Sequence, residues 1–338
     1  MSRGRPSGRR GRDGDGTPRQ TSLARLAEFE IVPRRSLGQN FLIDDNILGL
    51  VLERLQAGPD DVVIEVGAGL GVLTRALAGV TAHVQAFEID TKLEPALRAT
   101  LGSLLDTAAA LPTPGPPERN DGRPEGPYGP DGIAVAGMPR VILHFQDIMR
   151  AQLEALVPRP TLCASNLPYS VAAPFLAEAM TLLPHVRRFC VMVQREIADR
   201  LAATPGTKAY GAVSAWVQLH TSLVDARSLS RAIFYPKPRV DSSLLTLDRR
   251  PVDRPWSAGG TPSLVLRDPV LVRRVIDGAF GQRRKTAVNA LQAASGLPKE
   301  TLAAALVEVG ASAGARAEQL APEQFAALAE QLAQDWPR

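Results

Sequence analysis

The most specific chemistry in the sequence lies in the run Asn166-Leu167-Pro168-Tyr169. The Asn166 side chain and the Leu167 carbonyl can together accept two hydrogen bonds from an amino group. Such acceptors favour a more tetrahedral, more nucleophilic N6 of adenine, whose lone pair is otherwise delocalised into the ring. Pro168 holds the turn rigid, and Tyr169 offers a face for base stacking, worth about 1–3 kcal/mol. The alternative is an Asn-x-Pro loop with a packing tyrosine.

A second candidate site is the glycine-rich run Glu65-Val66-Gly67-Ala68-Gly69-Leu70-Gly71, which follows an apolar run and opens a helical pattern. Its glycines let the backbone approach a ligand. The dinucleotide pattern G-x-G-x-x-G/A is not met, because Val72 stands at its third position, and Glu65 disfavours a pyrophosphate. A cofactor with a positive charge and no phosphate, such as S-adenosylmethionine, tolerates that carboxylate. A tight turn without a ligand is the alternative.

Two further carboxylates follow predicted strands. Glu88 is placed to accept both hydroxyls of a ribose, and Asp147 could accept from an adenine amino group. Asp147 could equally be a loop or N-cap aspartate. Cys163 and Cys190 are isolated, which fits buried thiols in a reducing cytosol, and Cys163 lacks the proline neighbour that cytosine-C5 chemistry needs. The histidines and cysteines show no metal-ligand spacing, so we expect no metal.

Alternating strands and helices must position these residues. After residue 40, short apolar runs alternate with helical patterns, which predicts a doubly wound α/β sheet with right-handed crossovers. The expected strands are 62–66, 83–88, 141–145, 161–165, 189–193 and 242–247. The expected helices between them are 72–78, 91–105, 152–156 and 172–183. Beyond residue 268 the pattern is only helical, over 269–280, 285–294, 299–309 and 322–334.

Composition divides the chain further. We expect a disordered Arg/Gly-rich tail over 1–22, an α/β domain over 23–250, a linker over 251–265 and a helical RNA-binding domain over 266–338. Within the α/β domain, a Pro/Gly-rich insert over 108–136 is expected to be disordered. The tail has no apolar core for a signal peptide, and no apolar stretch is long enough to span a membrane. We therefore expect a cytoplasmic protein.

Seven motifs, taken together and in this order, resemble the ribosomal RNA adenine N6-dimethyltransferases. The resemblance covers about residues 30–335 without the insert, and it is carried by Ser36–Asp44, Glu65–Gly71, Asn166–Tyr169, Val193–Glu196, Lys208–Gly211, Phe234–Ser242 and Phe280–Thr286. It implies a Rossmann-like S-adenosylmethionine-dependent methyltransferase sheet with a small C-terminal all-helical domain. Two departures are the distance between Glu88 and Asp147, lengthened by the insert, and the Arg-rich tail, which has no family role.

The resemblance also implies site residues and partners. The cofactor site would be formed by Asn40, Leu42, Glu65, Gly67, Gly69, Glu88, Asp147 and Asn166. Leu167, Pro168 and Tyr169 would complete the target-base pocket, with Phe234 stacking on the other face of the base. The expected reaction dimethylates two adjacent adenosines in the 3′-terminal hairpin of small-subunit rRNA, within the 30S particle or its precursor. We expect no membrane partner and a monomer.

Residues 230–285 carry a net charge of +7, with twelve basic and five acidic side chains. Arg283, Arg284 and Lys285 stand at a predicted helix start, where cations are electrostatically unfavourable, so phosphate contact explains them better than a structural role. A solvated face is the alternative. Three other functions stay open: a macrolide-resistance methyltransferase acting on large-subunit rRNA, a non-catalytic RNA-binding assembly factor, and a dehydrogenase.

Overall fold

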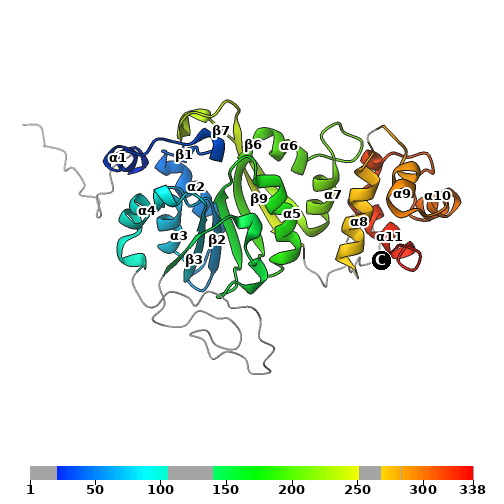
Figure 1. The fold of residues 1–338 in the computed structure, drawn as a ribbon, viewed down its shortest axis with the longest axis horizontal. Helices are drawn as coiled ribbons and strands as arrows, with labels where there is room; N and C mark the ends of the chain where they lie inside the picture. The colour runs from blue at the N-terminus through cyan, green and yellow to red at the C-terminus, as the bar shows by residue number, and fades with distance from the viewer. Residues whose placement is uncertain (1–20, 106–139, 251–267, 283, 338) are drawn as a thin grey trace, which may run out of the picture.

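A seven-stranded mixed sheet lies at the centre of the computed structural model (Figure 1), which describes residues 21–105, 140–250, 268–282 and 284–337. The strand order is β4-β3-β2-β5-β6-β9-β7. The first five are parallel, β9 runs antiparallel to its neighbours β6 and β7, and β7 therefore has the same direction as the first five. The strands are β2 (Val62–Val66), β3 (His83–Glu88), β4 (Val141–Phe145), β5 (Leu162–Asn166), β6 (Arg188–Gln194), β7 (Thr221–Leu229) and β9 (Ser242–Arg249).

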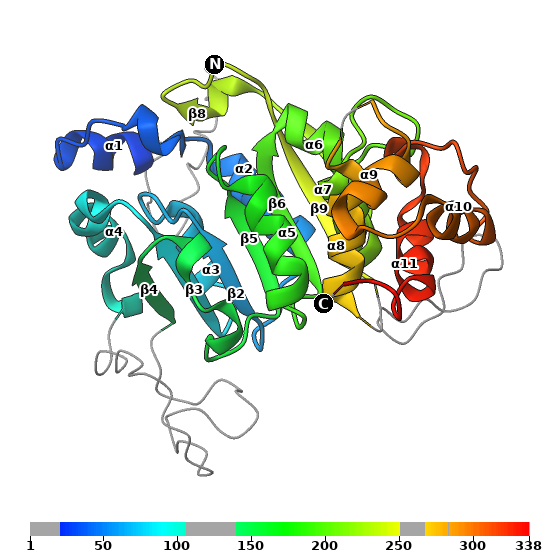
Figure 2. The same cartoon turned by 45° about the vertical axis from the view of Figure 1, so that its right-hand side comes forward.

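Helices cover both faces of the sheet because successive residues of each strand point to opposite faces. Val63 of β2 packs with α2 and α3, whereas Ile64 beside it packs with α5. Figure 2 shows α5 in front of the sheet and α2 behind it. The helices of this part are α1 (Thr21–Glu28), α2 (Asp45–Leu55), α3 (Val72–Ala78), α4 (Glu94–Leu101), α5 (Ala172–Leu182), α6 (Arg195–Leu201) and α7 (Ala212–His220). The α/β prediction is confirmed.

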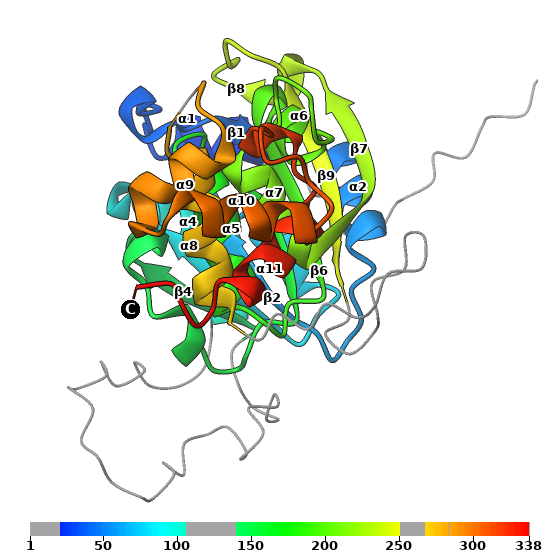
Figure 3. The same ribbon diagram turned by 90° about the vertical axis from the view of Figure 1, so that its right-hand side faces the viewer.

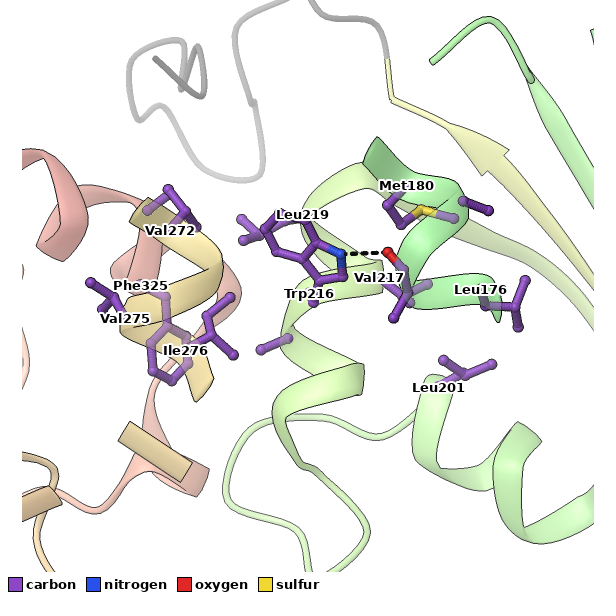
Figure 4. Close-up of a cluster of buried hydrophobic side chains, with 14 of the residues drawn as sticks. Leu176, Met180, Leu201, Trp216, Val217, Leu219, Val272, Val275, Ile276 and Phe325 are labelled. Atoms are coloured by element: carbon purple, nitrogen blue, oxygen red, sulfur yellow. Dashed lines mark hydrogen bonds between the residues drawn. The ribbon is translucent and has the colours of Figure 1, made fainter. Parts of the chain in front are cut away.

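Four C-terminal helices pack against the edge of the sheet domain through α7 (Figure 3). They are α8 (Pro269–Phe280), α9 (Ala287–Ser295), α10 (Lys299–Glu308) and α11 (Pro322–Gln331). Trp216 of α7 lies between the two parts: its Nε1 donates to the Ala177 carbonyl at 2.9 Å, and Ile276 and Phe325 belong to the same buried cluster (Figure 4). The helical part therefore shares a continuous hydrophobic core with the sheet domain.

Most predicted elements agree with the structure to within two residues. The helix expected over 91–105 is broken, because Gly102 adopts a φ of +51° and α4 ends at Leu101. The segment expected over 152–156 is one 3-10 turn, Leu153–Ala155. The sequence reading did not find β7, an edge strand whose middle is largely exposed and polar, nor α1, which begins inside the expected tail. The expectations for residues 1–20, 108–136 and 251–265 lie outside the described residues.

Arg249 fixes one end of this sheet without a carboxylate partner. Its guanidinium donates to four carbonyl oxygens at the end of α5 and before β6, those of Ala179, Met180, Leu183 and Val186, at 2.7–3.3 Å. It also lies over the Phe189 ring, 5.7 Å from its centroid. Burial lowers the pKa of Arg249 to about 10. The Ala179 and Leu183 carbonyls also accept from backbone amides, whereas for the Met180 and Val186 carbonyls Arg249 is the donor that the structure shows.

We predict that Arg249→Met lowers the free energy of unfolding by about 2–4 kcal/mol, because buried carbonyls lose their donor. Urea denaturation measures this change. The control is Arg98→Met, which removes only an exposed ion pair with Glu94 on α4 and should cost less than about 0.5 kcal/mol. Equal losses in both variants would show that Arg249 has no special structural role.

Candidate active site

One pocket of about 1010 Å³, including its open mouth, lies at the carboxyl ends of β2, β3, β4 and β5. This edge of an open α/β sheet is where such folds bind ligands. All eight residues expected to hold a cofactor line the pocket: Asn40, Leu42, Glu65, Gly67, Gly69, Glu88, Asp147 and Asn166. Leu167, Pro168 and Tyr169 line it too. The structure thus brings these residues, distant in sequence, to one place.

The Gly-rich loop is held in shape by β3. The Phe87 carbonyl accepts from the Gly67 and Ala68 amides at 2.8 and 2.9 Å. The Glu88 carboxylate accepts from the Gly69, Ile89 and Asp90 amides at 2.8–2.9 Å. Burial nevertheless raises the pKa of Glu88 above its ordinary value. Glu88 therefore shapes the loop as well as lining the pocket.

The loop also packs directly on the second motif. Gly67 has a φ of +79°, and a Cβ there would lie 3.3 Å from Cδ of Pro168. Gly71 has the same φ, and a Cβ on it would lie only 2.6 Å from Cδ1 of Leu97. Both positions therefore need glycine. Gly71, which the dinucleotide pattern left unexplained, is the left-handed residue that opens α3 against α4.

Glu65 is a buried carboxyl in the wall of the pocket. Burial raises its pKa to about 8. The neighbouring Thr74 hydroxyl offsets part of this rise in pKa, and Glu65 Oε2 has no hydrogen bond of normal geometry within the described residues. A buried polar atom without a partner is rare in a folded protein and suits a ligand with a donor or a positive charge.

The amide of Asn166 has one defined orientation. Its Nδ2 donates to the Asn40 carbonyl at 2.9 Å, which leaves Oδ1 without a donor from the described residues. The Leu167 carbonyl likewise accepts no hydrogen bond from them, whereas the Pro168 carbonyl is used by the Val171 and Ala172 amides at the start of α5. Two adjacent acceptors are therefore free at the pocket, as the sequence predicted.

The two aromatic residues of the predicted base pocket differ in where they lie relative to the pocket. Tyr169 is partly buried in the pocket wall, and this burial raises the pKa of its hydroxyl. Phe234 is only 3% exposed and is not in the lining of this pocket. It pairs with Leu42 in the small sheet of β1 (Phe41–Leu42) and β8 (Phe234–Tyr235), where the strand alternation turns it into the core. Its stacking role stays a prediction.

For two residues of the pocket, the sequence left the role open or gave no prediction. Asp147 does both things considered for it: it lines the pocket and caps a 3-10 turn by accepting from the Met149 amide at 3.0 Å. Ser22 was missed. It lies in α1, its hydroxyl donates to the Leu42 carbonyl at 2.5 Å, and it lines the pocket. The helical pattern of residues 21–28 was the available signal, hidden by the Arg-rich composition before it.

The basic residues of the C-terminal half divide into two groups. Several are used within the fold: Arg249 and Arg250 donate to carbonyls, Arg231 pairs with Asp241, and Arg273 pairs with Asp277. Among the described residues of 230–285, Lys237, Arg239, Arg284 and Lys285 are exposed and have neither an ion pair nor a side-chain hydrogen bond. Arg284 and Lys285 precede the N-terminus of α9, as expected. Arg283 lies outside the described residues.

Three general features complete the description. No group of three or more His, Cys, Asp or Glu residues that could hold a metal occurs within the described ranges. In those ranges, too, every helix is too short or too polar to cross a bilayer. Cys163 and Cys190 are buried free thiols, and burial raises the pKa of each to about 12, which makes them poor nucleophiles.

Known proteins with sequences similar to this chain are ribosomal RNA methyltransferases. Residues 32–107 and 134–334 match the ribosomal RNA adenine dimethylase family. The chain is 38% identical over 309 residues to the ribosomal RNA small subunit methyltransferase A of Streptomyces avermitilis, covering 91% of each chain. For the protein of that name from Bacillus thuringiensis the identity is 34% over 302 residues, covering 88% of this chain and 91% of the relative.

Two solved structures share the fold. A dimethyladenosine transferase from Plasmodium falciparum superposes with a TM-score of 0.64 at 17% identity, over 87% of this chain and 98% of its own. The 23S rRNA methyltransferase ErmE superposes with a TM-score of 0.54 at 23% identity, over 87% of this chain and 100% of its own. The family match, the two relatives and the pocket lead to one conclusion: the chain belongs to the ribosomal RNA adenine dimethylase family.

Proposed function

We propose that this chain transfers methyl groups from S-adenosylmethionine to N6 of two adjacent adenosines in the 3′-terminal hairpin of small-subunit rRNA. The observation that carries the proposal is the pair of free acceptors at one pocket, Asn166 Oδ1 and the Leu167 carbonyl. An amino group has two N–H bonds to donate, and both acceptors lie next to each other in the chain. Free acceptors of this kind serve an amino group better than a ring nitrogen or a hydroxyl.

The pocket residues fit the proposed cofactor. Glu65 offers an unpartnered buried carboxyl oxygen, Glu88 lies where a ribose would be bound, and Gly67 and Gly69 leave room for close approach. S-adenosylmethionine would supply an activated methyl group on a sulfonium. This chain's own residues position the adenine and orient its N6 lone pair. No general base is required, since the alkylated nitrogen is a strong acid that releases its proton to water.

The choice of the small subunit rests on relatives and on the C-terminal part. Both cited relatives are named for the small subunit and align over about nine tenths of their length. Two motifs that favour this target meet at the junction between the parts: Tyr210 of the Lys208–Gly211 segment lies 6.1 Å from Phe280, between ring centroids. A large-subunit target is the second candidate, because the ErmE fold is similar. We further propose a cytoplasmic monomer acting on the 30S particle or its precursor.

We predict that Asn166→Ala lowers kcat by about 10²–10³-fold, because the amino group loses one of its two acceptors in the transition state. Binding of unmethylated small subunits should stay within about 3-fold, since phosphate contacts dominate that affinity. Tritiated S-adenosylmethionine with small subunits, large subunits or naked rRNA, followed by mass spectrometry, measures transfer and its location. A loss of binding in proportion to rate would mark Asn166 as structural, and wild-type label only on large subunits would favour the second target.

Glu65 gives a prediction for cofactor binding. With its pKa raised to about 8, Glu65 carries a proton at pH 7, and a cationic ligand beside it would favour the ionised form. Binding of S-adenosylmethionine should therefore release a proton, and the affinity should rise with pH up to about 8. Calorimetry in buffers of different ionisation enthalpy measures the release. Glu65→Gln should abolish it; an undiminished release in that variant would assign the proton to another group.

The unpaired cations predict a salt dependence. Replacing both Arg284 and Lys285 by alanine should weaken small-subunit binding and reduce the slope of log K against log salt by about 2, because each phosphate contact contributes about 0.9. The matched control replaces Arg98 and Arg200, exposed cations that pair with glutamates on their own helices. An unchanged slope in the first variant would exclude Arg284 and Lys285 from the RNA contact.

A further inference from the structure

Asp90 is a buried carboxylate beside the pocket, but it is not part of the pocket wall. Its Oδ1 accepts from Arg34 Nη1 at 3.1 Å and from the Lys92 amide at 3.2 Å. Its Oδ2 accepts from Gln39 Nε2 at 2.8 Å. Two of these three donors come from a segment more than 50 residues away. Capping of the 3-10 turn Thr91–Leu93 accounts for the contact with the Lys92 amide and leaves the other two contacts unexplained.

Gln39 closes these contacts into a ring. Its Oε1 accepts from the Arg34 backbone amide at 2.8 Å while its Nε2 donates to Asp90. We call Arg34, Gln39 and Asp90 the clasp. Both ends of the Gln39 amide are thus satisfied in one orientation only, because reversing it would set donor against donor.

The clasp holds the stretch between two apolar contacts: Ile31, which packs on a small hydrophobic cluster, and Phe41, which is buried in that cluster. No residue from 31 to 40 is buried, although this segment forms one wall of the pocket through Leu37, Gly38, Gln39 and Asn40. Apolar packing holds the two ends of this stretch, and the hydrogen bonds to Asp90 hold the part between them. The residue directly after Gln39 is Asn40, whose carbonyl accepts from Asn166 Nδ2 at 2.9 Å.

We propose that Asp90 is a positioning residue: through the clasp it fixes the Asn40 carbonyl, which in turn orients the Asn166 amide so that its oxygen faces the target amino group. The nitrogen and oxygen of an amide are nearly the same size, so packing alone discriminates poorly between the two orientations. The Asn40 carbonyl supplies the discrimination, because it accepts only from nitrogen. The inference rests on the proposed function for its catalytic meaning, but not for its geometry.

The test exchanges the polarity of the clasp. Asp90→Asn removes an acceptor facing Gln39, and Gln39→Glu sets a carboxylate against Asp90, so each variant alone should break the ring. Together they restore it, because the new asparagine can donate to the new glutamate and still accept from Arg34. We expect each single variant to lower kcat by about 10-fold and the double variant to return to within about 3-fold of the wild type. Since the clasp also holds Gln39 and Asn40 in the pocket wall, Asp90→Asn should raise the KM for S-adenosylmethionine as well as lower kcat, and the double variant should reverse both changes.

A second readout does not depend on activity. In ¹⁵N-labelled protein, the Asn166 side-chain amide protons, assigned by their loss in Asn166→Ala, should exchange slowly with water. Exchange should be faster in Asp90→Asn, slow again in the double variant, and unchanged in the control Arg98→Ala on α4. The proposal is overturned if the single variants leave these protons and kcat unchanged, or if the double variant is no better than either single one. A wild-type protein that methylates no rRNA would refute the proposed function, while the proton exchange would still decide the role of the clasp.

Discussion

The site depends on the position of β2 between β3 and β5 in a parallel sheet. Because parallel neighbours end at the same edge, this pairing places the Gly-rich loop, Glu88 and Asn166 around one cavity. The Val66 amide donates to the Ser165 hydroxyl at 2.9 Å, which joins β2 to β5 just below the pocket. With the strands separated there, Gly67 could not pack on Pro168, and the cofactor side would lose contact with the target side.

Two neighbouring carboxylates organise two parts of the wall of this cavity. Glu88 holds the Gly-rich loop through backbone amides, and Asp90 holds the segment before Asn40 through side chains. Both are buried, and each has its charge compensated by donors rather than by water. Glu65, by contrast, has an oxygen without a donor in the described residues, which fits a group left for a ligand. Asp90 thus belongs to the scaffold alone, whereas Glu88 both shapes the loop and lines the pocket with Glu65.

Many basic residues of the C-terminal half make contacts within the fold and are therefore not available to a partner. Residues 230–285 carry a net charge of +7. However, the Arg249 guanidinium is hydrogen-bonded to backbone carbonyls such as that of Met180, and the Arg273 guanidinium lies over the Trp216 ring, 5.3 Å from its centroid. Arg249 thus stabilises the end of the sheet domain, and Arg273 the junction between the sheet domain and the helical part. Exposed residues such as Lys237 and Arg284 are the ones that we propose for contact with phosphate. The net charge of residues 230–285 is therefore larger than the positive charge that these residues present on the surface for RNA to contact.

The sequence by itself determined six strands of the main sheet, the Gly-rich loop and the Asn166–Tyr169 motif, because buried strands are short apolar runs and the motifs are contiguous in the chain. It also determined which residues would line the pocket, through the resemblance that they carry. Only the tertiary structure decided that Phe234 turns into the core, that α1 contributes Ser22, and that Asp90 is tied to Gln39. These facts depend on strand register and on contacts between residues at least 20 positions apart in the chain. Local sequence patterns do not predict such contacts.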